Sequence, residues 1–360
     1  MVDPRVFAEL LCGYCLEVGE RQQVLVRSTT LAAPLLLELQ RSILERGGWP
    51  LLRVELPGQT EGFYTHARDW QLDDHPAIAY EEAKRADATL GIQAPENTRA
   101  LSAIDPQRLA RANRARQPVR EQTLAHRWCS TLWPTQAGAQ QAGTSLPAFA
   151  TFVARALFLD QADPVAAWSE LRAFQAGLIE RLSRADVVRI EAEGTDLTLR
   201  VKDRTWVNSD GRRNMPSGEV FTGPLETSAE GTIVFDVPSS PAGVEVAGVT
   251  LRFREGVVVE AHAQRGDPYL QRALETDEGA RRLGELGIGT NFGIDRPIGA
   301  ILFDEKIGST VHLALGRSYP ETGGKNESAL HWDLIRDLRG GGRLTADGET
   351  IVDQDGFQVT

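Results

Sequence analysis

The chain has 360 residues, of which 41% are hydrophobic and 25% charged, and its formal net charge is −11. This length favours two domains, and the composition is that of an ordinary soluble globular protein. The net negative charge argues against a nucleic-acid or anionic-membrane partner, and without a long apolar run or a signal-peptide pattern we expect a cytoplasmic protein.

Three cysteines, Cys12, Cys15 and Cys129, are too few for a disulfide framework and fit a reducing compartment. Cys12 and Cys15 form a C-x-x-C pattern. They lie, however, in a helical pattern whose apolar stripe includes Phe7 and Leu10. We therefore interpret this segment as a core helix rather than as a metal or redox site.

The first half of the chain predicts an open parallel sheet. Strands are expected at 24–26, 49–55 and 88–92, and helices at 34–46 and after Asp105-Pro106. The arginines between Arg108 and Arg120 have helical spacing without interleaved aromatics, which indicates a solvated face. Because the chain has no G-x-G-x-x-G and no G-K-[ST] motif, a nucleotide site is unsupported.

The pattern then turns helical from Ala125 to Arg184, and we expect these helices to close the first domain. Short strands separated by Gly, Asp and Pro follow, with one helix near 268–278 and a final hairpin after Gly340–Gly342. The predicted fold class is α/β. An N-terminal open parallel-sheet α/β domain (1–184) precedes a C-terminal mixed, sheet-rich α+β domain (185–360) that carries the candidate metal site.

The candidate metal site begins with His331-Trp332-Asp333. Residues two apart in a strand point to the same face, so His331 and Asp333 converge while Trp332 packs on the other side. His312 lies on another probable strand, and Tyr319 follows after a short loop. Imidazole and carboxylate ligands together suit zinc, manganese or cobalt, whereas calcium and magnesium prefer oxygen alone.

Glutamates in the sheet-rich half add to this pattern. Glu219 directly follows a turn, and Glu285 is embedded among glycines and apolar residues, where an unpaired carboxylate would be costly. Each residue also has a simpler interpretation: a hydrogen-bonded pair for His331 and Asp333, a surface position for Glu219, and a buried salt bridge for Glu285. On the residues alone these alternatives stay open.

Four segments in order strengthen the metal-site interpretation: NMPSGEVFTGP (214–224), LGELGIGTN (283–291), DEKIGSTVHLALGRSYP (304–320) and SALHWDLI (328–335). Together they resemble the metallo-aminopeptidases of the aminopeptidase T and aminopeptidase S type, and the resemblance spans most of the chain. It implies a set of metal ligands made up of Glu219, Glu285, His312, His331 and Asp333. It also places Tyr319 at or beside the metals, and Glu305 nearby as a further ligand or a base.

The resemblance implies a homodimeric exopeptidase that uses two divalent metal ions, zinc, cobalt or manganese, to activate water against peptides with a free N-terminus. Glu219 or Glu305 would be the general base, and Tyr319 could hydrogen-bond the oxyanion. Two alternatives remain: a non-catalytic, metal-stabilised binding protein, or another metal-dependent amidohydrolase such as a carboxypeptidase. Structural zinc sites usually use Cys or His ligands, which makes the binding protein the weaker alternative.

Overall fold

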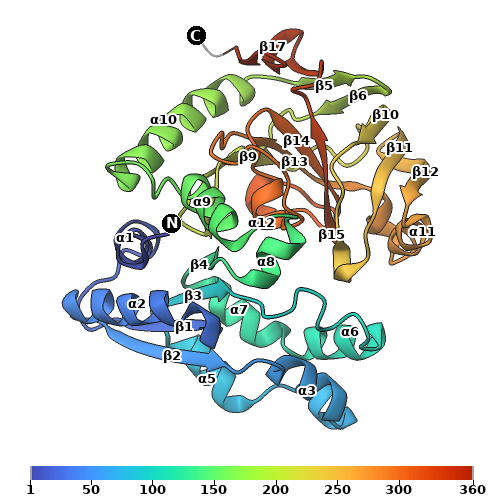
Figure 1. Cartoon of the computed structure of the whole chain (residues 1–360). Coiled ribbons are helices and arrows are strands. Elements are labelled where there is room, and N and C mark those ends of the chain that lie inside the picture. Colours follow the sequence, from blue (N-terminus) through green and yellow to red (C-terminus); the bar gives the residue numbers. More distant parts are fainter. Residues whose placement is uncertain (1, 359–360) are drawn as a thin grey trace. The chain divides into compact units, whose positions relative to one another are not determined.

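The computed structural model describes residues 2–358 and forms two compact units (Figure 1). The first comprises Met1–Val165 and Gly211–Pro216, and the second comprises Ala166–Asp210 and Ser217–Thr360. Most of helix α10 (Pro164–Leu182) thus falls in the second unit, where Leu178 and Leu182 enter the core. The division lies earlier in the chain than the boundary expected at residue 184, and the assignment of 1–184 and 185–360 as domains stays a prediction.

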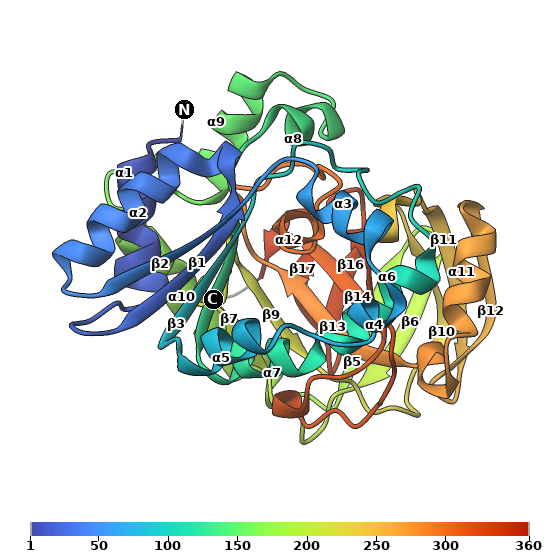
Figure 2. The same ribbon diagram turned by 90° about the horizontal axis from the view of Figure 1, so that it is seen from below.

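A five-stranded parallel sheet forms the first unit, in the order β2-β1-β3-β4-β8. Its strands are β1 (Gln23–Thr29), β2 (Trp49–Glu55), β3 (Ala88–Gln93), β4 (Arg127–Leu132) and β8 (Asn214–Met215). Val24, Leu25 and Val26 in β1 are all fully buried, because a parallel strand covered on both faces has no polar side. Figures 1 and 2 show helices α2 and α5 on opposite faces of this sheet.

The helices of the first unit are α1 (Pro4–Leu10), α2 (Ala33–Glu45), α3 (Gln59–His66), α4 (Asp69–Leu72), α5 (Ala77–Arg85), α6 (Pro106–Ala115), α7 (Gln117–Ala125), α8 (Gln136–Gln141) and α9 (Leu146–Ala156). The predicted strands at 24–26, 49–55 and 88–92 are confirmed, as is the helix at 34–46. Cys12 and Cys15 are buried in the π-helical turn Leu11–Cys15 after α1 and form no disulfide within residues 2–358, which confirms that the C-x-x-C pattern belongs to a core helix.

The prediction of an all-helical segment from Ala125 to Arg184 was wrong at its start, where β4 (Arg127–Leu132) lies. This strand pairs with β3 on one side and with β8 on the other. Since β8 comes from residues 214–215, one of the two neighbours of β4 is supplied by a distant segment. The helical periodicity of the flanking helices α7 and α8 dominates the hydrophobic pattern of this part of the sequence. The six residues of β4 are too few to show the two-residue period of a strand.

The second unit contains two antiparallel sheets, ordered β12-β11-β10-β6-β5-β16-β17-β18 and β15-β14-β13-β9-β7. The strands of the larger sheet are β5 (Val187–Ala192), β6 (Thr195–Arg200), β10 (Glu230–Phe235), β11 (Ala247–Arg254), β12 (Val257–Arg265), β16 (Arg343–Ala346), β17 (Glu349–Asp353) and β18 (Gly356–Phe357). Those of the smaller sheet are β7 (Val207–Ser209), β9 (Glu219–Thr222), β13 (Leu283–Gly289), β14 (Thr310–Gly316) and β15 (His331–Asp337). The predicted strands and final hairpin of this half are confirmed.

Helices α11 (Asp267–Leu274) and α12 (Ile301–Asp304) complete the second unit, and α11 confirms the helix expected near residue 268. One hydrophobic core joins the two sheets and α10. In the smaller sheet, alternate residues such as Val311 and Leu313 of β14 and Trp332 of β15 enter this core. The residues between them point to the opposite face of the smaller sheet, where polar side chains gather.

Within residues 2–358, no helix is both long enough and apolar enough to cross a membrane.

Candidate metal centre

Five side chains converge on the smaller sheet, on the face away from the core. They are Glu219 on β9, Glu285 on β13, His312 on β14, and His331 and Asp333 on β15. These four strands are neighbours in the order β15-β14-β13-β9, so each ligand-bearing strand lies beside the next. The sequence predicted the convergence of His331 and Asp333 from their spacing, and the structure brings both residues together with the other three.

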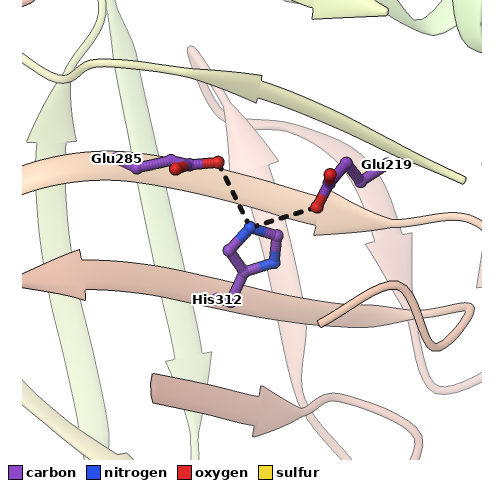
Figure 3. Close-up of side chains that lie close together, drawn as sticks. All are labelled: Glu219, Glu285 and His312. Carbon is purple, nitrogen blue, oxygen red and sulfur yellow. Dashed lines mark hydrogen bonds and ion pairs between the residues drawn. The ribbon is translucent and has the colours of Figure 1, made fainter. Parts of the chain in front are cut away.

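Glu285 lies between the two histidines. Its Oε1 is 3.4 Å from Nε2 of His312 and its Oε2 is 3.5 Å from Nε2 of His331. Figure 3 shows Glu219 approaching the same His312 nitrogen from the other side, with Oε2 at 3.4 Å. On the far side, Oδ2 of Asp333 is 3.6 Å from Nε2 of His331.

These contacts define two groups of three potential ligands that share Glu285. The first is Glu219, Glu285 and His312, and the second is Glu285, His331 and Asp333; within each, one donor atom per residue lies within 4.8 Å of the others. The first group is buried, whereas His331 and Asp333 are partly exposed. The second group is therefore the more accessible of the two.

The orientation of His331 is set by the backbone. Its Nδ1 lies 2.9 Å from the carbonyl oxygen of Arg317. A carbonyl can only accept, so Nδ1 carries the proton in this hydrogen bond and Nε2 of the neutral ring presents its lone pair to the site. The hydroxyl of Tyr319 lies 3.4 Å from that Nε2, and the two rings are 5.0 Å apart between centroids.

Glu305 and Lys306 border the site from the segment after α12. The Lys306 side chain is fully buried, and its ammonium group forms ion pairs with Glu305 and, at 3.5 Å, with Oε1 of Glu219. Glu305 belongs to neither group of three ligands. The sequence singled out Glu305 but assigned no role to Lys306, and no pattern around Lys306 in the sequence indicates that its side chain is buried.

The ionisation of the cluster reflects burial and crowded carboxylates. Burial raises the pKa of Glu219 and of Glu285, and it raises the pKa of Asp333 to about 6. Burial lowers the pKa of His312, but its hydrogen bond to Glu285 and the neighbouring carboxylate charges outweigh this and raise the pKa to about 10. The buried carboxylates therefore favour a positive charge among them, at the centre of the cluster.

The donor set fits a divalent cation. Within residues 2–358, Oε2 of Glu219 accepts no hydrogen bond. It lies 3.4 Å from Nε2 of His312. A buried carboxylate oxygen without a hydrogen bond is costly unless a cation satisfies it. The mixture of imidazole and carboxylate donors suits zinc, cobalt or manganese rather than calcium or magnesium.

Gly287 allows His312 to reach the site. The two residues are paired across β13 and β14, and a Cβ atom at Gly287 would lie 2.0 Å from Nε2 of His312. The imidazole thus lies directly over the glycine, in a space that any other side chain would occupy. This explains the glycine at position 287 of the segment 283–291.

We expect Gly287→Ala to displace the imidazole by about 1 Å or more and to weaken metal binding by at least about tenfold, because ligand orientation is lost. Equilibrium dialysis against zinc, followed by metal analysis, measures this. Gly91→Ala is the control, since no heavy atom lies within 4 Å of a Cβ built at that strand glycine. Unchanged zinc binding in Gly287→Ala would show that the imidazole of His312 can bind the metal without the space above Gly287.

Comparisons with known proteins support a metal site. The family model described as thermophilic metalloprotease (M29) matches residues 4–353. Aminopeptidase 2 of Geobacillus stearothermophilus is 30% identical, over 96% of this chain and 93% of its own length. Aminopeptidase T of Thermus aquaticus is 31% identical over 73% of this chain and 74% of its own length. The solved structure of wild-type AmpT from Thermus thermophilus superposes with a TM-score of 0.83 at 25% identity, over 98% of this chain and 96% of that one.

Proposed function

The chain belongs to the thermophilic metalloprotease (M29) family and is a metal-dependent aminopeptidase, and from this premise we propose that it works with two divalent ions held by Glu219, Glu285, His312, His331 and Asp333. The observation that carries the proposal is the position of Glu285. Its two carboxylate oxygens face two different histidines, at 3.4 and 3.5 Å. Glu285 can therefore act as a ligand in both groups at once. Zinc, cobalt and manganese are the candidates.

Divalent ions held by these residues would lower the pKa of water toward neutrality and polarise the scissile carbonyl. The protein's part is to hold the donors in place. His331 is fixed by its hydrogen bond to the carbonyl of Arg317, and His312 by its position over Gly287. Both histidines therefore meet the site with little need to reorganise.

We assign the general base to Glu305. Glu219 belongs to the first group of ligands, whereas Glu305 belongs to neither group and keeps its carboxylate at the border of the site through its ion pair with Lys306. A carboxylate held there can accept a proton from water and return it to the leaving amine. Glu305 is thereby proposed as a base rather than as a metal ligand.

Tyr319 is proposed to stabilise the oxyanion. Burial, reinforced by the carboxylates of Glu285 and Asp333, raises the pKa of Tyr319 above its ordinary value. The phenol therefore stays protonated at neutral pH and remains able to donate a hydrogen bond. Its place 3.4 Å from Nε2 of His331 puts this donor beside the second group of ligands.

The substrates are proposed to be peptides with a free N-terminus, since acidic side chains at the site can accept the α-ammonium group. We expect metal-stripped protein to be inactive, and added zinc, cobalt or manganese to restore cleavage of leucyl-p-nitroanilide but not of its N-acetylated form. Cleavage of both substrates would favour a general amidohydrolase or a carboxypeptidase. Metal binding without cleavage of either would favour a metal-stabilised binding protein.

A homodimer in the cytoplasm is also proposed. Family resemblance supports the dimer, and light scattering after size-exclusion chromatography would detect a monomer if it is wrong. Three buried cysteines that form no disulfide in the described part of the chain support a reducing compartment. Recovery of the native protein from an oxidising compartment would contradict the cytoplasmic location.

A further inference from the structure

A cavity of about 630 Å³ lies in the first unit, at the carboxyl ends of β1 and β2. Arg27 of β1 and Glu55 at the end of β2 form one wall, and residues of α3, α5 and α7 form the others. Every lining residue belongs to the first unit, whereas the five side chains of the candidate metal centre belong to the second. Its volume suits a small organic ligand.

Three arginines, Arg27, Arg116 and Arg120, line this cavity against a single acidic residue, Glu55. The sequence indicated a solvated face for the arginines between residues 108 and 120. Arg120 is exposed, as that interpretation expects, and it lines the cavity together with the half-buried Arg116, because α6 ends at Ala115 and α7 begins at Gln117.

The charges of the cavity are compensated only in part, since Arg27 interacts electrostatically with Glu82, which Arg53 already binds. Other arginines of the same unit pair with carboxylates: Arg53 with Glu82, Arg85 with Glu81, and Arg111 with Asp73. In the part of the chain that the structure describes, neither Arg27 nor Arg120 forms an ion pair. Glu55 accepts a hydrogen bond from Thr60 at 3.0 Å instead of binding an arginine.

The remaining arginine is fixed by an aromatic ring. The guanidinium carbon of Arg116 lies 4.7 Å from the ring centroid of Phe63, and this stacking restricts the group while leaving its N–H donors available. Like charges gathered around one cavity repel each other unless an anion lies between them. The geometry thus combines a fixed donor, two unpaired guanidinium groups and room for a ligand.

The place in the fold agrees with ligand binding. In open parallel sheets, ligands bind at the carboxyl ends of the strands, beside the point where the connections change direction. Here β1 has β2 on one side and β3 on the other, and the chain crosses from β2 back over β1 to reach β3. The connections thus change direction between β1 and β3, whereas the cavity lies at the neighbouring pair β1 and β2 and is lined by α3 and α5 of the crossing connection.

We propose that this cavity binds a small anion with carboxylate or phosphate groups, held by the guanidinium groups of Arg27, Arg116 and Arg120. Arginine is suited to both groups because its planar donors match two oxygens at once. The site is independent of the peptidase reaction, and its ligand would be recognised by its negative charge and not by a free N-terminus.

Isothermal titration of the metal-loaded protein at low ionic strength tests this, with succinate as the dicarboxylate probe and phenyl phosphate as the phosphate probe. We expect one of them to bind with one equivalent per chain. The double substitution Arg27→Gln/Arg120→Gln should weaken that binding by about tenfold or more, because two charge-assisted contacts are lost. Hydrolysis of leucyl-p-nitroanilide should be unchanged in the double variant, which also reports on correct folding.

Arg114→Gln is the matched control, since this exposed arginine of α6 lies outside the cavity lining. It should leave binding within about twofold of wild type, as expected for a distant surface charge. The proposal is wrong if neither probe binds the wild-type protein, if the double variant binds as tightly as wild type, or if Arg114→Gln weakens binding equally. The probe that binds identifies the anion class.

Discussion

Glu285→Gln should abolish both metal binding and hydrolysis, because the glutamine removes the charge from a side chain shared by both groups of ligands. One of its oxygens faces His312 and the other faces His331. We expect kcat/KM to fall by at least about a thousandfold, since losing one preorganised electrostatic group alone typically costs a hundredfold to a thousandfold. Metal analysis after dialysis should show the loss of both ions.

Single substitutions of the histidines test whether the two groups of potential ligands each bind a metal ion. His312 belongs only to the first group and His331 only to the second. We therefore expect His312→Ala and His331→Ala each to lose one equivalent of bound metal and to keep the other. Glu260→Gln is the control, because Glu260 is an exposed strand residue that pairs with Arg252 away from the site. Retention of two equivalents of metal in Glu285→Gln would contradict a shared ligand, and loss of both in His331→Ala would contradict two separable metal positions.

Much of this site could be predicted from the sequence because its chemistry follows strand periodicity. His331 and Asp333 flank a core tryptophan, so the spacing alone predicted that they share a face. The resemblance supplied Glu219 and Glu285, which local sequence left open between surface, salt-bridge and ligand roles. The structure adds what periodicity could not give, which is that the shared residue is Glu285.

The features that the sequence did not reveal depend on contacts between distant segments. Strand β4 is completed by β8, more than eighty residues further along the chain. The role of Gly287 follows from its pairing with His312, which only the register of β13 and β14 defines. Lys306 is similar: a lysine is normally exposed, and nothing nearby in the sequence indicates that Glu219 lies 3.5 Å from its ammonium group.

Lys306→Met should lower activity and selectively destabilise the metal-stripped protein. The ammonium group is fully buried between Glu219 and Glu305, and removing it leaves these carboxylates without their cation. Breaking a buried ion pair by removing one partner typically costs about 3–5 kcal/mol. Divalent ions at the neighbouring ligands supply positive charge to the same carboxylates, so the metal-loaded variant should lose much less stability.

This difference is measured by denaturant unfolding of wild type and Lys306→Met, each without metal and with zinc. We expect the substitution to lower the free energy of unfolding more in the metal-stripped proteins than in the zinc-loaded ones. Activity should fall about a hundredfold or more even when the variant is loaded, because Glu305 loses the partner that positions it as a base. Lys202→Met is the control, since Lys202 is largely exposed and lies 3.9 Å from Asp186. If Lys306→Met loses the same free energy of unfolding with and without zinc, Lys306 fills space rather than balancing the charge of the metal site. If the zinc-loaded variant keeps full activity, Glu305 is not the general base.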